Sequence, residues 1–181
     1  MKASGRKLKI AILAVVVALL AFFIFCVLAP AVAFLVPMKA IVETAARGRE
    51  RLFYETNYEE LLVACRELAK RVAEGDLKPK RYCVSGDDSD PNASTFPHVI
   101  LNLEPRFVHI DSHGVVDMEL LPAFNFFGVR ASPEGQEGWG DVKLIDGLWY
   151  YDADYRDEHP KHMRKIDAMI EEGRQRRRAP R

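Results

Sequence analysis

The chain has 181 residues, of which 26 are basic and 26 acidic, so its formal charge at pH 7 sums to zero. Three parts of different sign make up that zero. Residues 1–37 hold four basic and no acidic residues, residues 38–160 hold 14 basic and 23 acidic residues, and residues 161–181 hold 8 basic and 3 acidic residues. The acidic middle part argues against a nucleic-acid partner, because a basic surface is needed to hold phosphates. Its length suits one domain with its own core.

A basic N-terminus, residues 1–9, is followed by an apolar run at residues 10–36 that contains no charged residue. A helix of that length measures roughly 40 Å, against a bilayer hydrocarbon core of about 30 Å. The run therefore predicts a transmembrane helix, with the lipid bilayer as its partner. Pro30 lies near its far end, where the missing backbone donor should kink the helix or end its lipid-buried part.

Basic residues also predict the orientation of this segment. Four precede the apolar run, whereas Lys39 is the only one between the run and Arg47. The positive-inside rule then leaves the N-terminus in the cytoplasm and the C-terminal domain on the extracytoplasmic side. The alternative is a signal peptide cleaved near Ala33, which would give a secreted protein. We favour an uncleaved signal-anchor, because the apolar run before Ala33 exceeds the roughly 7–15 residues of a signal peptide.

Two helices are predicted after the apolar run. Residues 37–56 mix small apolar residues with charges and predict a helical stalk. Thr56 to Glu59 matches a capping box, in which each side chain bonds a free backbone donor at a helix start. A second helix should therefore begin near Asn57. Its apolar residues recur at helical spacing as far as Gly75, which is a suitable terminator.

The rest of the predicted domain, which spans residues 57–173, is mainly strand. Residues 76–97 contain prolines and glycines that predict a loop, with one short strand at 82–84. Strand-like composition and alternation then recur in six further runs, at residues 99–103, 107–110, 115–121, 124–130, 142–145 and 148–151. Asp146-Gly147 suits a type I′ hairpin turn between the last two runs. The predicted fold class is α+β, a small antiparallel β-meander of four to six strands packed with one or two helices.

A last amphipathic helix is predicted over residues 159–173, with Pro160 tolerated in its first turn. Residues 174–181 are rich in arginine and predict a basic disordered tail. On the extracytoplasmic side, such a tail would meet anionic lipid head groups or an acidic partner. A purely solubilising tail is the alternative.

Aromatic residues that could form a ligand platform concentrate late in the chain. Trp139 lies in a glycine-rich stretch, and Trp149, Tyr151 and Tyr155 follow it. Aromatic rings near a flexible loop are typical of sites for a sugar ring or a peptide. Strand alternation places Trp149 and Tyr151 on one face, and the alternative is that this face belongs to the core.

Cys65 and Cys83 are the two cysteines that lie outside the apolar run. An oxidising exterior would let them form a disulfide that ties the second helix to the following strand. The alternative is a pair of free thiols, since Cys65 falls on the apolar face of its helix, where buried free cysteines are common.

Three groups of residues carry metal-binding side chains without a diagnostic spacing: His109 with Asp111 and His113, His159 with His162, and Asp87, Asp88 and Asp90 with Asn92. Ordinary strand, turn and loop positions explain each group equally well. The sequence also lacks a nucleophile elbow around any serine. We therefore predict no catalytic residue, no metal site and no cofactor.

These observations leave two classes of function. The favoured one is a single-pass membrane-anchored protein with an extracytoplasmic binding or scaffolding domain, whose partner is a protein or an envelope polymer. The alternative is a small membrane-anchored hydrolytic enzyme that uses His109, Asp111 or His113. A cleft in which histidine and carboxylate converge would favour the enzyme, and exposed, separate positions would favour binding.

Overall fold

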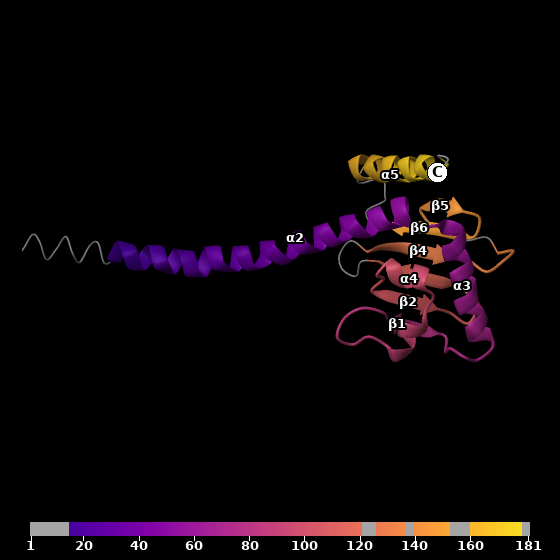
Figure 1. The fold of residues 1–181 in the computed structure, drawn as a ribbon. Coiled ribbons are helices and arrows are strands. Elements are labelled where there is room, and N and C mark those ends of the chain that lie inside the picture. The colour runs from indigo at the N-terminus through magenta and orange to yellow at the C-terminus, as the bar shows by residue number, and fades with distance from the viewer. Residues whose placement is uncertain (1–14, 121–125, 137–139, 153–159, 179–181) are drawn as a thin grey trace, which may run out of the picture. The chain divides into compact units, whose positions relative to one another are not determined.

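The structure is a computed structural model that describes residues 15–120, 126–136, 140–152 and 160–178 (Figure 1). The chain divides into two compact units, Met1–Glu43 and Thr44–Arg181. The second unit has the predicted α+β class, with a six-stranded antiparallel sheet and several helices. The helix predicted over residues 37–56 is present, but its last part belongs to the second unit, where Leu52 and Phe53 have no exposed surface.

The described part of the first unit is helical. Residues 15–23 form α-helix, the π-helical turn η1 (Ile24–Leu28) follows, and α2 (Ala29–Glu50) then begins. The helix does not end at Pro30. Because Pro30 has no amide hydrogen, the helical bond to the carbonyl of Cys26 cannot form, and η1 lies where that bond is missing.

Large apolar side chains in residues 15–26 are exposed, from Val16 at 45% to Phe25 at 77%. Among the helices that the structure describes, none combines the length and the apolar character needed to cross a membrane.

The sheet of the second unit has the strand order β1-β2-β3-β4-β6-β5. Its strands are β1 (Lys80–Cys83), β2 (Phe107–Ile110), β3 (Val116–Glu119), β4 (Phe127–Ala131), β5 (Val142–Ile145) and β6 (Leu148–Asp152). The predicted meander is therefore correct only through β4. The β5–β6 hairpin turns at Gly147, where φ is +87°, and places β6 between β4 and the edge strand β5.

One face of the sheet forms the core. Tyr82, Val108, Met118, Val129 and Tyr150, from five different strands, are each at most 1% exposed. The helix α3 (Tyr58–Ala73) packs on this face and contacts β2, β3, β4 and β5 (Figure 1). Full burial of one large apolar side chain contributes about 1.5–3 kcal/mol, so this layer holds the helix on the sheet.

The start of α3 lies within one residue of the predicted position, but its cap is different. Asn57 Oδ1 accepts the backbone N–H of Glu59 at 3.1 Å and that of Glu60 at 3.3 Å. Thr56, predicted as the cap, instead donates its hydroxyl to the carbonyl of Arg51 at 2.9 Å. That carbonyl begins the π-helical turn η2 (Arg51–Glu55), which ends at Thr56. The Thr56 hydroxyl is therefore bonded to the preceding turn, and Asn57 caps α3 in its place.

The strand predicted over residues 99–103 is wrong, because this segment forms the short helix α4 (His98–Asn102). It follows the 3₁₀ turn η3 (Pro91–Thr95). Ile100 and Leu103 are both buried, at helical rather than strand spacing, and α4 packs against α3. A run of β-branched and apolar residues has a strand-like composition, and tertiary packing overrides it here.

Arg49, near the end of α2, joins that helix to β6 through a buried ion pair. Its guanidinium donates to Asp152 Oδ2 at 2.8 Å and 3.2 Å, and to the Tyr150 hydroxyl at 3.2 Å. Tyr150 in turn donates to Asp152 Oδ2 at 2.5 Å. The Asp152 side chain has no exposed surface and that of Arg49 only 11%. The buried carboxylate is therefore fully supplied with donors.

The last helix, α5 (Pro160–Arg178), extends through most of the segment predicted to be disordered. Gly173 does not end it. A side chain there would place Cβ 2.1 Å from the carbonyl oxygen of Phe53, so glycine lets α5 lie directly against η2. Arg177 Nη1 donates to that same oxygen at 2.7 Å. Arg177, in the segment predicted to be a tail, is thus held in place by η2.

Candidate functional site

A row of side chains crosses all six strands on the face opposite the core. In spatial order the members of this outer row are Arg81, His109, Asp117, Arg130, Trp149 and Lys143. Each is the direct partner of the next across an antiparallel pair, so all six share one face. Arg81, His109 and Lys143 are exposed, and the other three are partly exposed. The outer row thus offers alternating donors, acceptors and one indole ring.

Ion pairs hold the charged members of the outer row in position. Arg130 pairs with Asp117 on the neighbouring strand. Arg81 donates to Glu119 Oε2 at 2.6 Å and lies over the ring of Phe107, 3.6 Å from its centroid. Cross-strand pairs of this kind contribute about 0.2–1 kcal/mol each, so their main effect is to order the surface.

Tyr151 provides a second, firmly held aromatic ring on this face. Its ring lies over Gly128, where an added Cβ would come within 2.6 Å of the ring. Its hydroxyl donates to the carbonyl of Met118 at 3.2 Å. Burial, reinforced by the nearby Asp117 carboxylate, raises the pKa of Tyr151, which therefore stays a neutral donor. Phe126, 46% exposed, lies 6.4 Å from this ring between centroids.

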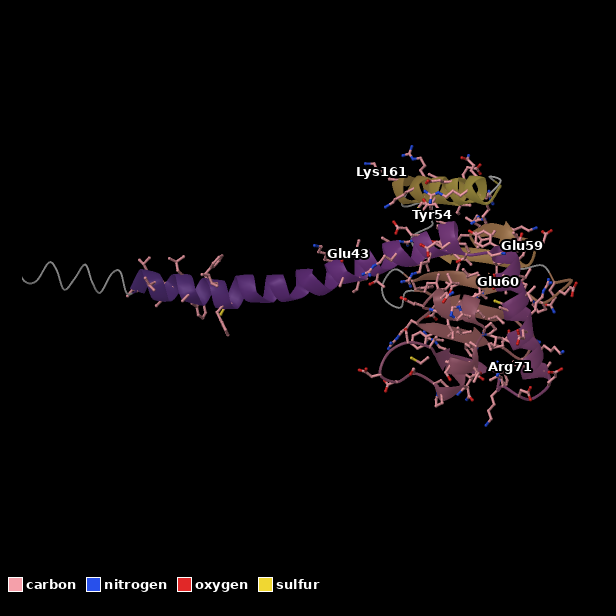
Figure 2. The ribbon with its side chains drawn as sticks, viewed as in Figure 1. Glu43, Tyr54, Glu59, Glu60, Arg71 and Lys161 are labelled. Carbon is pink, nitrogen blue, oxygen red and sulfur yellow. The ribbon has the colours of Figure 1, made fainter. Side chains whose placement is uncertain are left out.

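A cleft of about 740 Å³ lies in the second unit where α5 ends and α3 begins. Residues that line this arginine cleft are Tyr54, Glu55, Thr56, Asn57, Tyr58, Glu59, Leu144, Ile145, Arg174, Arg176 and Arg177. Figure 2 labels Tyr54 beneath α5 and Glu59 at the start of α3. The guanidinium of Arg176 lies 4.4 Å from the ring centroid of Tyr54, and that of Arg177 lies 4.0 Å from that of Tyr58.

Two buried polar atoms in the arginine cleft have no hydrogen-bond partner. They are the Tyr58 hydroxyl and Arg177 Nη2. Tyr58 is only 2% exposed. Burial raises the pKa of Tyr58, and the adjacent Arg177 charge offsets part of that rise. The Arg177 guanidinium lies over the Tyr58 ring, so the two groups are in direct contact.

No family model, curated protein or solved structure matches this chain.

The structure brings two of the four predicted platform residues together. Trp149 and Tyr151 share the outer face of β6, as strand alternation predicted, and Lys143 Nζ lies 5.9 Å from the Trp149 ring. Trp139 and Tyr155 lie outside the described residues. Sequence reasoning missed Phe126, which was assigned only to a strand, although the alternation in β4 could have placed it beside Tyr151.

Cys65 and Cys83 are both free thiols. Cys65, on the buried face of α3, is 1% exposed, and burial raises the pKa of its thiol to about 12. Cys83 follows the core residue Tyr82 in β1, so it lies on the opposite face of the sheet. Its thiol donates to the carbonyl of Ser85 at 3.4 Å. The sheet thus lies between the two sulfur atoms, whose pairing the sequence left open.

The histidine and carboxylate groups considered from sequence do not converge. Asp111 Oδ1 accepts the backbone N–H groups of His113 at 2.8 Å and Val115 at 2.9 Å, so this carboxylate stabilises a turn. His109 and His113 are exposed. Within the described part of the chain, no cluster of three or more histidine, cysteine, aspartate and glutamate residues is placed to hold a metal ion.

The remaining predicted groups are partly described. His159 lies outside the described residues, and His162 is placed only by its backbone. Asp90 caps η3 by accepting the backbone N–H of Asn92 at 2.9 Å, and it pairs with Lys80 at 2.5 Å. These bonds lower the pKa of Asp90, with the Lys80 bond as the largest cause. This loop carboxylate is therefore used by the fold.

Proposed function

We propose that this chain is a single-pass membrane-anchored protein whose folded unit, residues 44–181, is an extracytoplasmic binding domain for an extended carbohydrate polymer of the envelope. The observation that carries the proposal is the outer row, which presents one polar or aromatic side chain from each of the six strands. A compact ligand would need a pocket, whereas a flat row across a sheet suits a polymer.

The anchor is supported by the apolar run at residues 10–36 and by the exposure within it. Apolar side chains such as Phe22 at 67% and Phe25 at 77% are exposed on this helix. Exposed apolar surface of this extent is unfavourable in water and favourable in lipid. The basic residues before the run keep the N-terminus cytoplasmic, so the folded unit is extracytoplasmic.

The chemistry of the outer row favours a carbohydrate ligand. Sugar rings stack on accessible aromatic faces, and Trp149 and Tyr151 are both partly exposed on this side of the sheet. Hydroxyl and amide groups of a sugar both donate and accept hydrogen bonds, and the row contains three cationic donors, a histidine and the Asp117 carboxylate, which is paired with Arg130. Its length, five strand spacings, is about 24 Å. Several consecutive sugars would therefore contact it at once.

Binding is favoured over the hydrolytic alternative by the same face. His109 lies exposed in the outer row, and the Asp111 carboxylate is used in the following turn. A hydrolase needs a nucleophile, a base and a group that orients the base within hydrogen-bonding distance of one another. The arrangement of His109, Asp111 and His113 offers no such contact, so we rank a binding domain first.

Tryptophan fluorescence and calorimetry with oligomers of N-acetylglucosamine test the polymer proposal. The full chain, in a zwitterionic detergent, should bind these oligomers with an affinity that rises with length until the oligomer spans the outer row. Trp149→Ala and Arg81→Ala should each weaken binding about tenfold, which corresponds to the loss of one stacking or charge-assisted contact.

Lys70→Ala is the matched control, because Lys70 is an exposed cation on α3, far from the outer face, with 71% side-chain exposure. It should leave sugar binding unchanged. No binding by the wild-type chain, or equal weakening by Lys70→Ala, would refute the carbohydrate assignment. Binding of an acidic or apolar peptide to the outer row, sensitive to Trp149→Ala, would instead identify a protein partner.

The anchor is tested separately, by alkaline carbonate extraction of membranes and by the intact mass of the extracted chain. The full-length chain should stay with the membrane fraction, and its mass should include residues 1–33. A soluble chain that begins at residue 34 would establish the secreted alternative.

A further inference from the structure

The arginine cleft points to a second ligand, and we propose that it binds a phosphate group. The charged and phenolic side chains of this cleft lie on η2, α3 and α5, and none of these side chains belongs to the outer row. Failure of carbohydrate binding would therefore leave this proposal standing, and the reverse also holds.

The cations of the arginine cleft come from the end of α5. Arg174 and Arg177 are three positions apart, so they lie on one face of the helix, and Arg176 approaches from the adjacent face. Arg174 donates to the carbonyl of Lys143 at 3.2 Å, and Arg177 donates to that of Phe53 at 2.7 Å. These bonds fix the two side chains, and Arg174 also pairs with Glu171 at 3.9 Å.

The unpartnered atoms indicate what the ligand must provide. Arg177 Nη2 is a buried donor without an acceptor, and the Tyr58 hydroxyl is a second donor beside it. Buried donors are unfavourable when they stay unbonded, and an ionised oxygen is the strongest acceptor available to them. A ligand with anionic oxygens would satisfy both atoms.

The N-terminus of α3 adds partial positive charge to the arginine cleft. Asn57 caps this helix of 16 residues, and its first turn lines the arginine cleft. The helix dipole places partial positive charge there, which favours an anion. Glu55 and Glu59 also line the cleft, and Glu171 and Glu172 pair with Arg174 and Arg176, so the cleft has no excess of positive charge. Binding must therefore depend on the placement of donors more than on bulk charge.

A phosphate fits this donor set better than a carboxylate does. One guanidinium satisfies a planar carboxylate through two parallel hydrogen bonds. The arginine cleft instead offers three guanidinium groups and a phenol from two helices, which suits a tetrahedral anion with several oxygens. Such a group occurs on phospholipid heads and as free or esterified phosphate in solution, and the experiment must separate these sources.

The test is calorimetric titration of the full chain in a zwitterionic detergent with two probes, inorganic phosphate and short-chain phosphatidylglycerol. Tyr58→Phe removes one unpartnered hydroxyl and keeps the ring under Arg177. Arg176→Gln removes a guanidinium that is paired at the surface with Glu172. Each substitution should weaken binding about fivefold to tenfold. Lys165→Gln changes the charge of the same helix at an exposed position outside the cleft and should have no effect.

Saturable binding of either probe with this pattern of variants supports the proposal. Binding of phosphatidylglycerol alone assigns the lipid source, and binding of inorganic phosphate with equal affinity assigns free phosphate. Absence of saturable binding of both probes would overturn the proposal. So would equal weakening by Lys165→Gln and Arg176→Gln, since that result would mean that net charge, rather than the cleft, attracts the anion.

Discussion

Arg49 and Arg177 each lie against a tyrosine in the folded unit, but their surroundings differ in one respect. Arg49 and Tyr150 share the Asp152 carboxylate, which accepts hydrogen bonds from both. Arg177 and Tyr58 have no carboxylate between them, and each keeps a buried donor without a partner. In the first pair, Asp152 accepts hydrogen bonds from both side chains, and the pair stabilises the fold. The second pair lacks one acceptor, and that is what distinguishes a ligand site from a structural ion pair.

The largest expected effect comes from Arg49→Ala. This change leaves the fully buried Asp152 carboxylate without its cation, and loss of one partner of a buried ion pair costs about 3–5 kcal/mol. Urea unfolding of the full chain in a zwitterionic detergent, followed by circular dichroism, measures the free energy of unfolding. Arg47→Ala, at an exposed position of the same helix, should change it by less than about 0.5 kcal/mol. Similar losses of unfolding free energy in Arg49→Ala and Arg47→Ala would contradict a structural role for the ion pair between Arg49 and Asp152.

The same atom can be removed from both tyrosines. Tyr150→Phe deletes hydrogen bonds to charged groups and should cost about 1.5–3 kcal/mol. Tyr58→Phe deletes a hydroxyl that has no partner, so the free energy of unfolding should stay the same or rise slightly. The two values come from parallel urea titrations in the absence of phosphate. A loss for Tyr58→Phe as large as that for Tyr150→Phe would mean that the fold already satisfies this hydroxyl.

Gly173→Ala should disturb the arginine cleft without substituting a charged residue. The new Cβ would lie 2.1 Å from the carbonyl oxygen of Phe53, so α5 must shift away from η2. Overpacking of this kind costs about 1–3 kcal/mol. The variant should also lose phosphate affinity, which calorimetry detects. Lys165→Ala, on the exposed side of α5, should change neither quantity.

The smallest effect is spectroscopic. Burial raises the pKa of both tyrosines, and Tyr150 is raised well above 10 because Asp152 adds to burial, whereas Arg177 offsets part of the rise for Tyr58. Their folded-state contributions to stability are complete below the unfolded pKa near 10 and are lost as the pH rises above it. Absorbance at alkaline pH should show Tyr58 ionising before Tyr150. The titration of Tyr58→Phe should lack the earlier step, and an unchanged curve would contradict the assignment.

The sequence predicted elements whose signals are local. β2 and β5 match their predicted ranges residue for residue, and the hairpin at Gly147 follows from its Asp-Gly turn. Strand order could not be obtained in this way. Nothing near β6 indicates that it pairs with β4 as well as β5, because that choice depends on which strand edge is free when the hairpin forms.

Part of the proposed binding surface could be predicted from the sequence. Alternation in β6 placed Trp149 and Tyr151 together, and the rest of the outer row needs the register of five strand pairs. The arginine cleft could not be predicted from the sequence, because it depends on a contact between Arg177 and Phe53, which lie 124 positions apart in the chain. Composition indicated a tail rich in arginine, and it could not show that a glycine at position 173 lets that tail dock as a helix.

The contact between η2 and α5 also bears on how the domain folds during synthesis. η2 stands early in the folded unit and α5 late, so the segment that covers Phe53 is synthesised after the sheet and α3. Contacts of such large sequence separation form late, because closing a long loop costs entropy before the contact rewards it. The sheet and α3 can assemble first, with one apolar patch open. Docking of α5 then covers Phe53 and forms the cleft in the same step, so a folded unit without α5 would lack both.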